Sequence, residues 1–460
     1  MLNVKIRMPK GASYIINELN KNGFEAYIVG GCVRDSLLGM VPHDWDITTS
    51  ATPQQVKEIF RKTVDTGIQH GTVTVLVDKA HSGKGEYAYE VTTYRVDGIY
   101  EDHRRPKEVS FSKSLTEDLK RRDFTINAMA YNDKDGIVDI FGGSNDLEKH
   151  IIRCVGMPSE RFDEDALRIL RAVRFAAQLG FDIDEPTMLA MKNQAAYLKD
   201  ISAERIREEF TKLITSDNPD MIKTAYELGL TKVFLPEFDL MMDTPQNNPN
   251  HLYSVGEHTI CVMENVPKNV VLRYAALLHD VGKPGCRITD ENGTDHFYGH
   301  QDKGSKIAND ILRRLKFDNE TIDKVTKLVM YHDYGISGDV GIKAFRRFLT
   351  KLGVENFDDF IIIRNADRLG QSDYNQDKKK ENITRLKTMY DEIIDGKQCL
   401  AIKDLKIDGK DLIELGMNPG RELGGVLKSL LEYVLDEPEL NDRDKLLELA
   451  KNMIEEQKNF

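Results

Sequence analysis

The sequence is poor in the residues that mark secreted, membrane-bound and zinc-ribbon proteins. Its 460 residues include 5 cysteines, none in a C-x-x-C pair, which argues against zinc ribbons and disulfide frameworks. No apolar run is long enough to cross a bilayer, and the start, MLNVKIRMPKG, lacks the apolar core of a secretory signal. We therefore expect a cytoplasmic protein without membrane contacts, whose small buried cysteines are Cys32, Cys154, Cys261, Cys286 and Cys399.

The chain also lacks an excess of positive charge. It has 64 Lys and Arg against 76 Asp and Glu, a net charge of −12. Unspecific binding of nucleic acid needs clustered Lys and Arg that displace counterions, so only local basic stretches can contact RNA. The content of 40% hydrophobic and 30% charged residues is typical of globular proteins, and the length predicts several domains.

Strand signals are confined to the first part of the chain. Residues 12–140 mix helical stretches with the β-branched runs TVTVLV (72–77) and YEVTTYR (89–95), which predicts a small α/β domain. After Gly143 the pattern is almost entirely that of amphipathic helices. The polar segment 241–254, rich in Pro and Asn, predicts a boundary between helical modules.

Carboxylates in the first domain indicate a metal site. Residues 23–49 predict a strand, a Gly-Gly turn, a short helix and a second strand carrying Asp44 and Asp46. Residues i and i+2 of a strand point to one face, so both carboxylates can bind the same ions, and oxygen ligands suit Mg²⁺. Glu90 is the candidate third carboxylate, on a neighbouring strand. Two such ions can activate a 3′-hydroxyl and stabilise a pyrophosphate leaving group.

The Gly-Gly turn complements these carboxylates. Gly30 and Gly31 lack the Cβ that would keep a triphosphate at a distance, and their amides with Arg34 offer an anion cradle. Alone, a D-x-D pair is more often an exposed strand end and a Gly-Gly pair only a turn. Their combination favours a nucleotide site.

This combination resembles the DNA polymerase β-like nucleotidyltransferases, specifically the class II tRNA nucleotidyltransferase and poly(A) polymerase family. RRDFTINAMA (121–130) resembles its second motif, which implies that Arg122 meets phosphate and that Asp123 and Asn127 contact the ribose hydroxyls. VDIFGG (138–143) resembles its hinge between head and neck. The resemblance covers essentially the whole chain. It implies an α+β head with a small polymerase β-like sheet, followed by an all-α neck, body and HD-type helical domain.

Residues 161–181 predict an amphipathic helix that matches the family's base-selecting motif. Asp165 and Arg168 stand at i and i+3 and are expected on one helix face. The carboxylate can accept the exocyclic amine of cytosine or adenine while the guanidinium donates to the adjacent ring atom, a polarity that refuses guanine and uracil. An isolated pair of this kind is usually a surface salt bridge.

Two further arginines and the next helix complete the predicted neck. Arg171 and Arg174 continue the i+3 spacing, and the resemblance assigns them to nucleotide binding, although Arg174 lies about half a turn from Asp165. The helix expected over residues 201–214 resembles the family's following motif. We expect it to support the neck through salt bridges of Glu204, Arg205 and Glu208.

A set of histidines and aspartates after residue 250 resembles the HD-domain metal-dependent phosphohydrolases. The resemblance predicts a first metal held by His258, His279, Asp280 and Asp367, and a second completed by His300 and His332. Such ligands suit Mn²⁺, Fe²⁺, Co²⁺ or Ni²⁺ as well as Mg²⁺. A cyclic phosphate, a nucleotide and a damaged tRNA end all remain open as substrates.

Four domains follow from these patterns and from the resemblance: the head (1–143), the neck and body (144–245), the HD domain (246–375) and a C-terminal helical portion (376–460), which the resemblance implies binds tRNA. In the last, Lys410, Arg421 and Lys428 are available for phosphates, with a neutral helical cap as the alternative. The expected function is addition of CCA to tRNA from CTP and ATP. The charged loop 94–111 resembles the one found in A-adding and CCA-adding members of the family, which implies complete CCA or terminal A addition. An A-adding enzyme, a poly(A) polymerase and primarily an HD phosphohydrolase are the alternatives.

Overall fold

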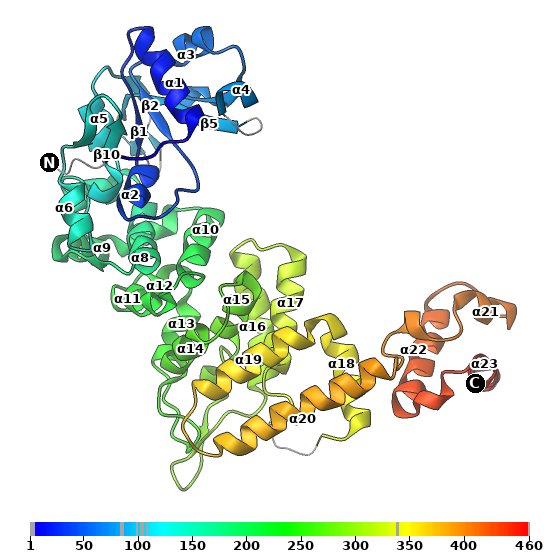
Figure 1. Cartoon of the computed structure of the whole chain (residues 1–460). Coiled ribbons are helices and arrows are strands. Elements are labelled where there is room, and N and C mark those ends of the chain that lie inside the picture. The colour runs from blue at the N-terminus through cyan, green and yellow to red at the C-terminus, as the bar shows by residue number, and fades with distance from the viewer. Residues whose placement is uncertain are drawn as a thin grey trace. The chain divides into compact units, whose positions relative to one another are not determined.

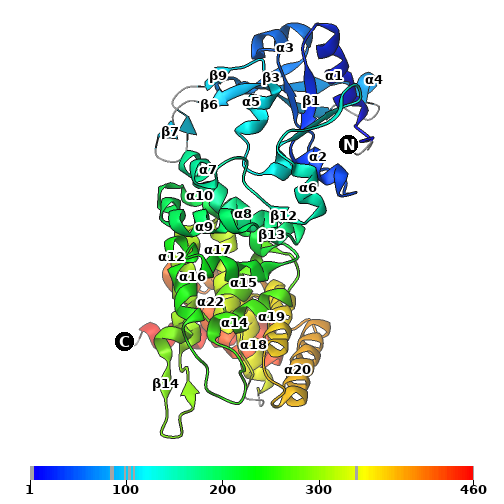
Figure 2. The same cartoon turned by 90° about the vertical axis from the view of Figure 1, so that its left-hand side faces the viewer.

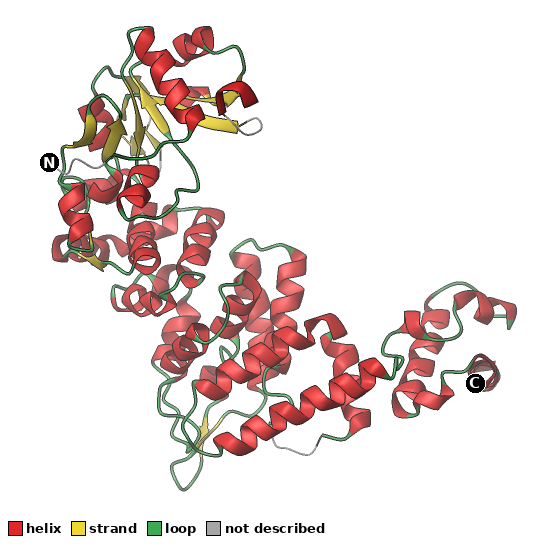
Figure 3. Cartoon of the chain, viewed as in Figure 1, coloured by secondary structure: helices red, strands yellow, loops and turns green. Residues whose placement is uncertain are grey.

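The computed structural model describes residues 5–82, 87–97, 100–101, 105–106, 109–336 and 340–458. The chain forms two compact units, Met1–Asp239 and Leu240–Phe460. Strands are concentrated in the N-terminal part and helices make up nearly all of the rest (Figure 3), which confirms the expected α+β head followed by helical modules. Among the described residues, no helix is both long and apolar enough to span a membrane.

A seven-stranded mixed sheet forms the head (Figure 1). Its order is β11-β10-β1-β2-β5-β4-β3, and only β2 and β5 run parallel. The predicted run 72–77 is β4, and the run 89–95 falls largely in β5. The strands are β1 (Ala26–Val29), β2 (Ile47–Thr49), β3 (Thr63–Gly67), β4 (Thr72–Val77), β5 (Tyr87–Thr93), β10 (Met129–Asn132) and β11 (Gly136–Asp139).

Strand β1 is buried at every position because both faces of the sheet are covered. Helix α1 (Lys10–Lys21) packs on one side of β1, which strand alternation assigns to Ile28. The other face carries a cluster formed by Tyr27, Val29, Tyr94, Leu119 and Ala130. This double burial fixes the end of β1, from which the candidate site starts.

The charged segment 94–111 carries two short antiparallel pairs. Strand β6 (Arg95–Asp97) pairs with β9 (Val109–Phe111), and β7 (Tyr100–Glu101) pairs with β8 (Arg105–Pro106). The remaining parts of the predicted loop, residues 98–99, 102–104 and 107–108, lie outside the described residues, as do residues 1–4 at the start.

The VDIFGG segment ends β11 and starts α6 (Gly143–Glu148). The Asp139 carboxylate accepts hydrogen bonds from the amides of Gly143 (2.8 Å) and Ser144 (2.9 Å), which otherwise lack partners in the first turn of the helix. A Cβ at Gly143 would collide with the carbonyl oxygen of Thr125. The motif is therefore a tightly packed helix start.

The expected continuous helix over 161–181 is wrong, because the chain forms two helices there. Helix α7 (Pro158–Glu164) ends before Asp165, whose backbone is extended (φ −142°, ψ 102°), and α8 (Leu167–Leu179) begins two residues later. The Asp165 carboxylate accepts the amide of Leu167 (3.1 Å), a local bond that competes with helix continuation. Helix α8 buries its predicted apolar side of Leu167, Leu170 and Val173.

The rest of the first unit is helical apart from one short parallel strand pair. The helices are α9 (Glu185–Gln194), α10 (Ala203–Ile214), α11 (Ile222–Glu227), α12 (Thr231–Phe234) and α13 (Pro236–Met242), of which α13 crosses the limit between the two units. The strand pair is β12 (Ile151–Ile152) with β13 (Asp182–Ile183).

The second unit is a set of helices with one small hairpin (Figure 2), formed by β14 (Ile288–Thr289) and β15 (Asp295–His296). Stacked and edge-on aromatic rings, including Phe345, Phe348, Phe357 and Phe360, form part of its core. The helices are α14 (Val255–Glu264), α15 (Val270–Leu278), α16 (His300–Arg314), α17 (Asn319–Tyr331), α18 (Ile342–Leu352), α19 (Phe357–Leu369), α20 (Gln376–Asp395), α21 (Gly409–Glu414), α22 (Arg421–Asp436) and α23 (Arg443–Lys458).

Candidate functional site

Asp44 and Asp46 lie in the segment directly before β2, which corrects their expected place on that strand. The ladder reaches only the backbone of Asp46, whose carbonyl accepts the amide of Val29 (3.0 Å). Beyond Val29 the partner strand turns away, and the Gly30 amide bonds to the carbonyl of Met129 (3.1 Å) instead. Asp44 therefore has no strand partner on β1, and both carboxylates are exposed.

Glu90 occupies the neighbouring register position. Strands β2 and β5 are parallel with Ile47 opposite Val91, so Asp46 and Glu90 stand at the same end of the pair. The pKa of Asp46 is raised, first by desolvation and further by repulsion from Glu90 and Asp44, while Arg122 partly offsets the rise. The three carboxylates are thus electrostatically coupled. Their oxygen atoms nevertheless do not all come within 4.8 Å of one another.

The turn between β1 and α2 (Gly31–Leu37) requires glycine at Gly30. Its φ of 79° is strained for other residues, and a Cβ there would lie 2.9 Å from Nη1 of Arg122. Arg122 also contacts Asp118 at 3.4 Å, but its buried Nε has no hydrogen-bond partner. This places an unused cationic donor beside both the glycine turn and Asp46.

A hydrogen-bond network joins the head to the neck helix α8. Arg34 donates to Oδ1 of Asn127 (2.7 Å), and Asn127 donates to Asp123 (3.1 Å). Arg171 donates twice to Oδ2 of Asp123, at 2.9 and 2.6 Å. Burial alone would raise the pKa of Asp123, but Arg171 and Asn127 hold it well below its usual range. Four of the predicted nucleotide-binding residues therefore share one network.

Three guanidinium groups surround the buried ring of Phe175. The Cζ atoms of Arg34, Arg171 and Arg174 lie 5.0, 5.3 and 3.5 Å from its centroid. All three lie within the range of cation–π attraction, which the buried ring strengthens. The ring thus orients cations from the head and the neck toward each other.

Glu209 balances two of these charges and was missed by the sequence reasoning. It is 5% exposed, and it contacts Nε of Arg174 at 2.8 Å and Nη1 of Arg171 at 3.7 Å. The burial of Glu209 could have been predicted, because Ile206 and Phe210 define the buried side of α10 and Glu209 falls between them on the helix. Of the predicted supporting residues of α10, Glu204 and Glu208 are exposed and Arg205 makes an ion pair.

Asp165 and Arg168 do not pair with each other. Asp165 accepts from Arg205 (2.8 Å), whereas Arg168 donates to Glu164 (2.6 Å) and to the carbonyl of Arg121 (2.8 Å). The reason is the helix break, which removes Asp165 from the i, i+3 geometry of a continuous helix.

The six predicted metal ligands of the second unit come together in its interior. All are at most 8% exposed, and they come from five helices or helix ends: His258 on α14, His279 and Asp280 after α15, His300 on α16, His332 after α17 and Asp367 on α19. The structure therefore brings these six residues together.

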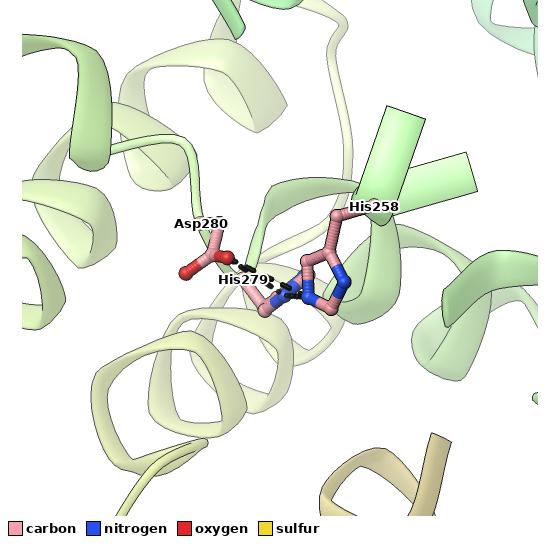
Figure 4. A group of neighbouring side chains, drawn as sticks. All are labelled: His258, His279 and Asp280. Carbon is pink, nitrogen blue, oxygen red and sulfur yellow. Dashed lines mark hydrogen bonds and ion pairs between the residues drawn. The ribbon is translucent and has the colours of Figure 1, made fainter. Parts of the chain in front are cut away.

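Two groups of potential ligand atoms share Asp280. In the first (Figure 4), the Nε2 atoms of His258 and His279 are 3.3 Å apart, and Oδ2 of Asp280 lies 3.8 and 3.2 Å from them. In the second, Nε2 of His300 and of His332 each lie 3.5 Å from Oδ1 of Asp280. Asp367 lies beside the first group, with its Oδ1 atom 3.0 Å from Nε2 of His258.

The second nitrogen of each histidine is fixed by the backbone. Nδ1 of His279, His300 and His332 each lies 2.7 Å from a carbonyl oxygen, and Nδ1 of His258 lies 3.1 Å from that of Gly370. Such contacts orient imidazoles so that Nε2 faces a metal. The Nε2 atoms of the four histidines are thereby directed toward the carboxylate of Asp280.

Asp280 carries the charge that organises this site. Burial would raise its pKa, but His279 and Lys283, whose Nζ lies 2.6 Å from Oδ2, hold the pKa well below its usual value. A pocket of about 520 Å³ opens onto Asp280, His300 and His332. His251 also lines it, and burial together with nearby Lys283 and His258 lowers the pKa of His251 to about 2. Sequence reasoning did not single out His251 or Lys283.

The three basic residues predicted for RNA contact in the C-terminal portion are exposed. Lys410 lies on α21, and Arg421 and Lys428 lie on α22.

Comparisons with known proteins agree with the geometry of the head. Residues 26–153 match the poly A polymerase head domain, residues 180–242 match an RNA and SrmB binding site of polymerase A, and residues 301–450 match domain 2 of tRNA nucleotidyltransferases. The CCA-adding enzyme of Ligilactobacillus salivarius is 37% identical over 451 residues, 97% of each chain. That of Enterococcus faecalis is 35% identical, over 96% of this chain and 95% of its own.

A solved structure supports the same assignment. The CCA-adding enzyme of Bacillus stearothermophilus in complex with CTP has a TM-score of 0.67 and 28% identity, over 98% of both chains. Together with the head motifs, these matches define the chain as a nucleotidyltransferase. It belongs to the family of CCA-adding enzymes, as the sequence resemblance predicted.

Proposed function

We propose that the chain adds C, C and A to the 3′ end of tRNA, using CTP and ATP and releasing pyrophosphate. The observation that carries this is Arg34, which follows the glycine turn and contacts both Asn127 of the head and the Phe175 ring of the neck. It connects the groups suited to phosphate with those suited to the base. The near full-length relatives bear the name of this activity, and one was solved with CTP.

Divalent cations, with Mg²⁺ as the expected ion, would be held by Asp44, Asp46 and Glu90. Exposed oxygen ligands suit Mg²⁺, and a cation would relieve the repulsion that raises the pKa of Asp46. When bound, such ions activate the 3′-hydroxyl and stabilise the leaving pyrophosphate. The unused Nε of Arg122 and the amide of Gly31 would hold the triphosphate, whereas the amide of Gly30 is bonded to the carbonyl of Met129 and Gly30 contributes only its missing Cβ.

Base selection is assigned to the neck. A carboxylate has about four acceptor sites, and Asp165 accepts from Leu167 and Arg205, which leaves capacity for the exocyclic amine of cytosine or adenine. Arg168 would exchange its contact with Glu164 for the adjacent ring atom of the base. Arg171 and Arg174 complete the nucleotide pocket, and Asp123 and Asn127 hold the ribose.

We place the tRNA on the helices after the head. This proposal includes the domain limits at residues 143, 245 and 375. It also includes contacts of the tRNA with Lys410, Arg421 and Lys428.

The test is incubation with tRNA that ends before CCA, with CTP and ATP supplied singly and together and the products resolved to single nucleotides. We expect addition of two C with CTP alone and of CCA with both. Addition of a run of A would indicate a poly(A) polymerase. If only tRNA that already ends in CC were extended, the chain would be an A-adding enzyme. The variant Asp44→Asn with Asp46→Asn should be inactive, and the surface variant Asp65→Asn, matched in chemistry, should be active.

The six buried histidines and aspartates of the second unit, called the buried cluster below, favour a second function. We propose that they form a metal-dependent phosphohydrolase site of the HD type. The supporting observation is Asp280, whose two carboxylate oxygens are buried and each face a different pair of histidines. That is the arrangement expected of a carboxylate shared by two cations. Bound there, a cation would acidify a water for attack on a phosphoester.

Replacing His279 and Asp280 together by alanine tests this second function. Hydrolysis of small phosphoesters in Mg²⁺, Mn²⁺ or Ni²⁺ should disappear, while CCA addition stays within several-fold of normal. The exposed aspartate variant Asp323→Ala is the control, and the melting temperature of each variant monitors folding. Hydrolysis that survives in the double variant would contradict the assignment.

A further inference from the structure

A fully buried carboxylate lies behind the phosphate end of the nucleotide site. Asp118 is on the short helix α5 (Leu115–Lys120), whose next residue, Leu119, packs into the apolar cluster on β1. This packing places the Asp118 side chain in the interior, where its exposed fraction is 0%. Burial of an ionised carboxylate costs free energy that an apolar residue of similar volume would not, so folding alone does not explain an aspartate here.

The two oxygens of Asp118 are assigned to different arginines. Oδ1 accepts from Nε (3.0 Å) and Nη2 (2.8 Å) of Arg121. Oδ2 accepts from Nη2 of Arg122 (3.4 Å) and from the hydroxyl of Thr48 (3.1 Å). Burial alone would raise the pKa of Asp118, but Arg122 and Arg121 hold this pKa below its usual value. The carboxylate therefore stays ionised at neutral pH.

Arg122 lies between the glycine turn and the exposed carboxylates. Its Nη1 atom would be 2.9 Å from a Cβ at Gly30, so the guanidinium borders the turn. Burial raises the pKa of Asp46, and the attraction of Arg122 counteracts this rise. Thr48, which bonds to the same oxygen of Asp118, follows Asp46 by two residues on β2. Asp118 thus fixes Arg122 relative to that strand, and without it the guanidinium would be drawn to Asp46.

We propose that Asp118 is a positioning residue of the nucleotide site, which holds the guanidinium of Arg122 where it meets the triphosphate of CTP or ATP. The proposal rests on the nucleotide addition proposed above and adds a residue that lies outside the motif of residues 121–130. Because the triphosphate is common to both nucleotides, Asp118 acts on both equally.

Asp118→Asn removes the contact with Arg122 and keeps the shape of the side chain. The amide oxygen still accepts both bonds from Arg121, while the amide nitrogen takes the place of Oδ2 and donates to the Thr48 hydroxyl, but it cannot accept from Arg122. Loss of a hydrogen bond between charged groups changes an equilibrium constant by about tenfold or more.

The first measurement is binding by calorimetry in Mg²⁺. With Asp118→Asn we expect binding of CTP and of inorganic tripolyphosphate to weaken about tenfold. Cytidine has no phosphate and should bind within about twofold of the native protein, since its contacts do not involve Arg122. Unchanged or tighter binding of tripolyphosphate would overturn the proposal, because the carboxylate would then be neutral or repulsive toward the phosphates.

Asp146→Asn is the matched control. Asp146 is also a buried aspartate of the head (3% exposed), and it accepts from the hydroxyl of Thr125 (2.6 Å) and from Nε of Arg153 (3.2 Å). Neither partner is assigned to the nucleotide, so tripolyphosphate binding should stay within about twofold of native even where the melting temperature falls. An equal loss of binding in both variants would mean that Asp118 acts only through the stability of the head.

A double variant tests whether Asp118 acts through Arg122. In the Arg122→Ala background, Asp118→Asn should change tripolyphosphate binding by less than about twofold, because the residue that it positions is absent. A further loss as large as in the native background would show that the two effects are independent and would overturn the proposal.

The transfer assay separates this role from the proposed function. Asp118→Asn should raise KM for CTP and for ATP by the same factor and leave KM for tRNA unchanged. A change confined to one nucleotide would contradict the proposal, since the base contacts would then be affected. A native protein that adds neither C nor A, but whose tripolyphosphate binding depends on Asp118, would refute only the proposed function. A native protein that binds no tripolyphosphate would contradict the positioning role as well.

Discussion

Replacing Glu209 by alanine would leave two guanidinium groups around Phe175 without their shared counter-charge. Arg174 is the more affected, since its side chain is 9% exposed and its Nε lies 2.8 Å from Glu209. Removal of one partner of a buried ion pair typically costs about 3–5 kcal/mol. Arg174 keeps the Gln178 side chain (2.9 Å) and the ring, and Arg171 keeps Asp123, so we expect the lower end, about 3 kcal/mol.

Two substitutions separate charge from packing and position. Glu209→Gln keeps an oxygen acceptor and removes the charge, so we expect a loss of about 1–2 kcal/mol. Glu208→Ala changes the exposed neighbour on the same helix and should stay within about 0.5 kcal/mol of the native protein.

Urea unfolding followed by intrinsic fluorescence provides the assay. The only tryptophan, Trp45, lies between Asp44 and Asp46, so its emission reports the first unit alone. A loss for Glu209→Ala no larger than that for Glu208→Ala would refute the argument. So would a double variant with Arg174→Ala whose loss equals the sum of the two single losses, because the residues would then be uncoupled.

Three further predictions concern selection, acid stability and thiol reactivity. Asp165→Ala should admit UTP and GTP, and a variant that still adds only C and A in the tRNA assay would show that Asp165 does not read the base. The pKa of Asp123 is lower in the folded protein than in the unfolded chain, where it is about 4, so its charge stabilises the fold fully above that pH and this stabilisation is lost as the pH falls below it. Asp123→Asn should therefore reduce the slope with which the unfolding free energy falls in acid. An unchanged slope would contradict this prediction. Burial raises the pKa of Cys32 and Cys154 to about 12, so both thiols stay protonated at pH 8. They should therefore resist a thiol reagent that modifies the half-buried Cys286. Mass mapping of the modified sites in the native protein would check this.

Much of the head could be predicted because its signals are local. Alternating β-branched residues define β4 and β5, and glycine without a Cβ marks the turn at Gly30. The exact place of Asp44 and Asp46 was missed, because the end of β2 is set by where β1 turns away and not by the residues of β2 itself.

The neck shows where periodicity fails. The apolar spacing of residues 161–181 continues through Asp165 without interruption, so nothing in the spacing predicts the break. The break is stabilised by Arg205, 40 residues away, and by the local bond to Leu167. Glu209 could have been found from the phase of α10, but its partners Arg171 and Arg174 could not, because they depend on how two helices pack.

In the second unit, the residues of the buried cluster and their division into two groups could be predicted, but the sharing of Asp280 by both groups could not. His279 and Asp280 follow an apolar helix, and motif order indicated the others. That Asp280 faces both histidine pairs depends on the packing of four helices around it.

The shared position of Asp280 makes the stability of the second unit depend on whether metal ions are bound. The ligand atoms span residues 258 to 367 and meet only when that whole stretch is folded. An ion that binds only the folded form at about 100 times its dissociation constant adds about 2.7 kcal/mol to the unfolding free energy. Cleavage by proteases that act on the opened form slows by the same factor, about 100-fold. With the metal site proposed above, the supply of metal ions would set how long the second unit survives proteolysis.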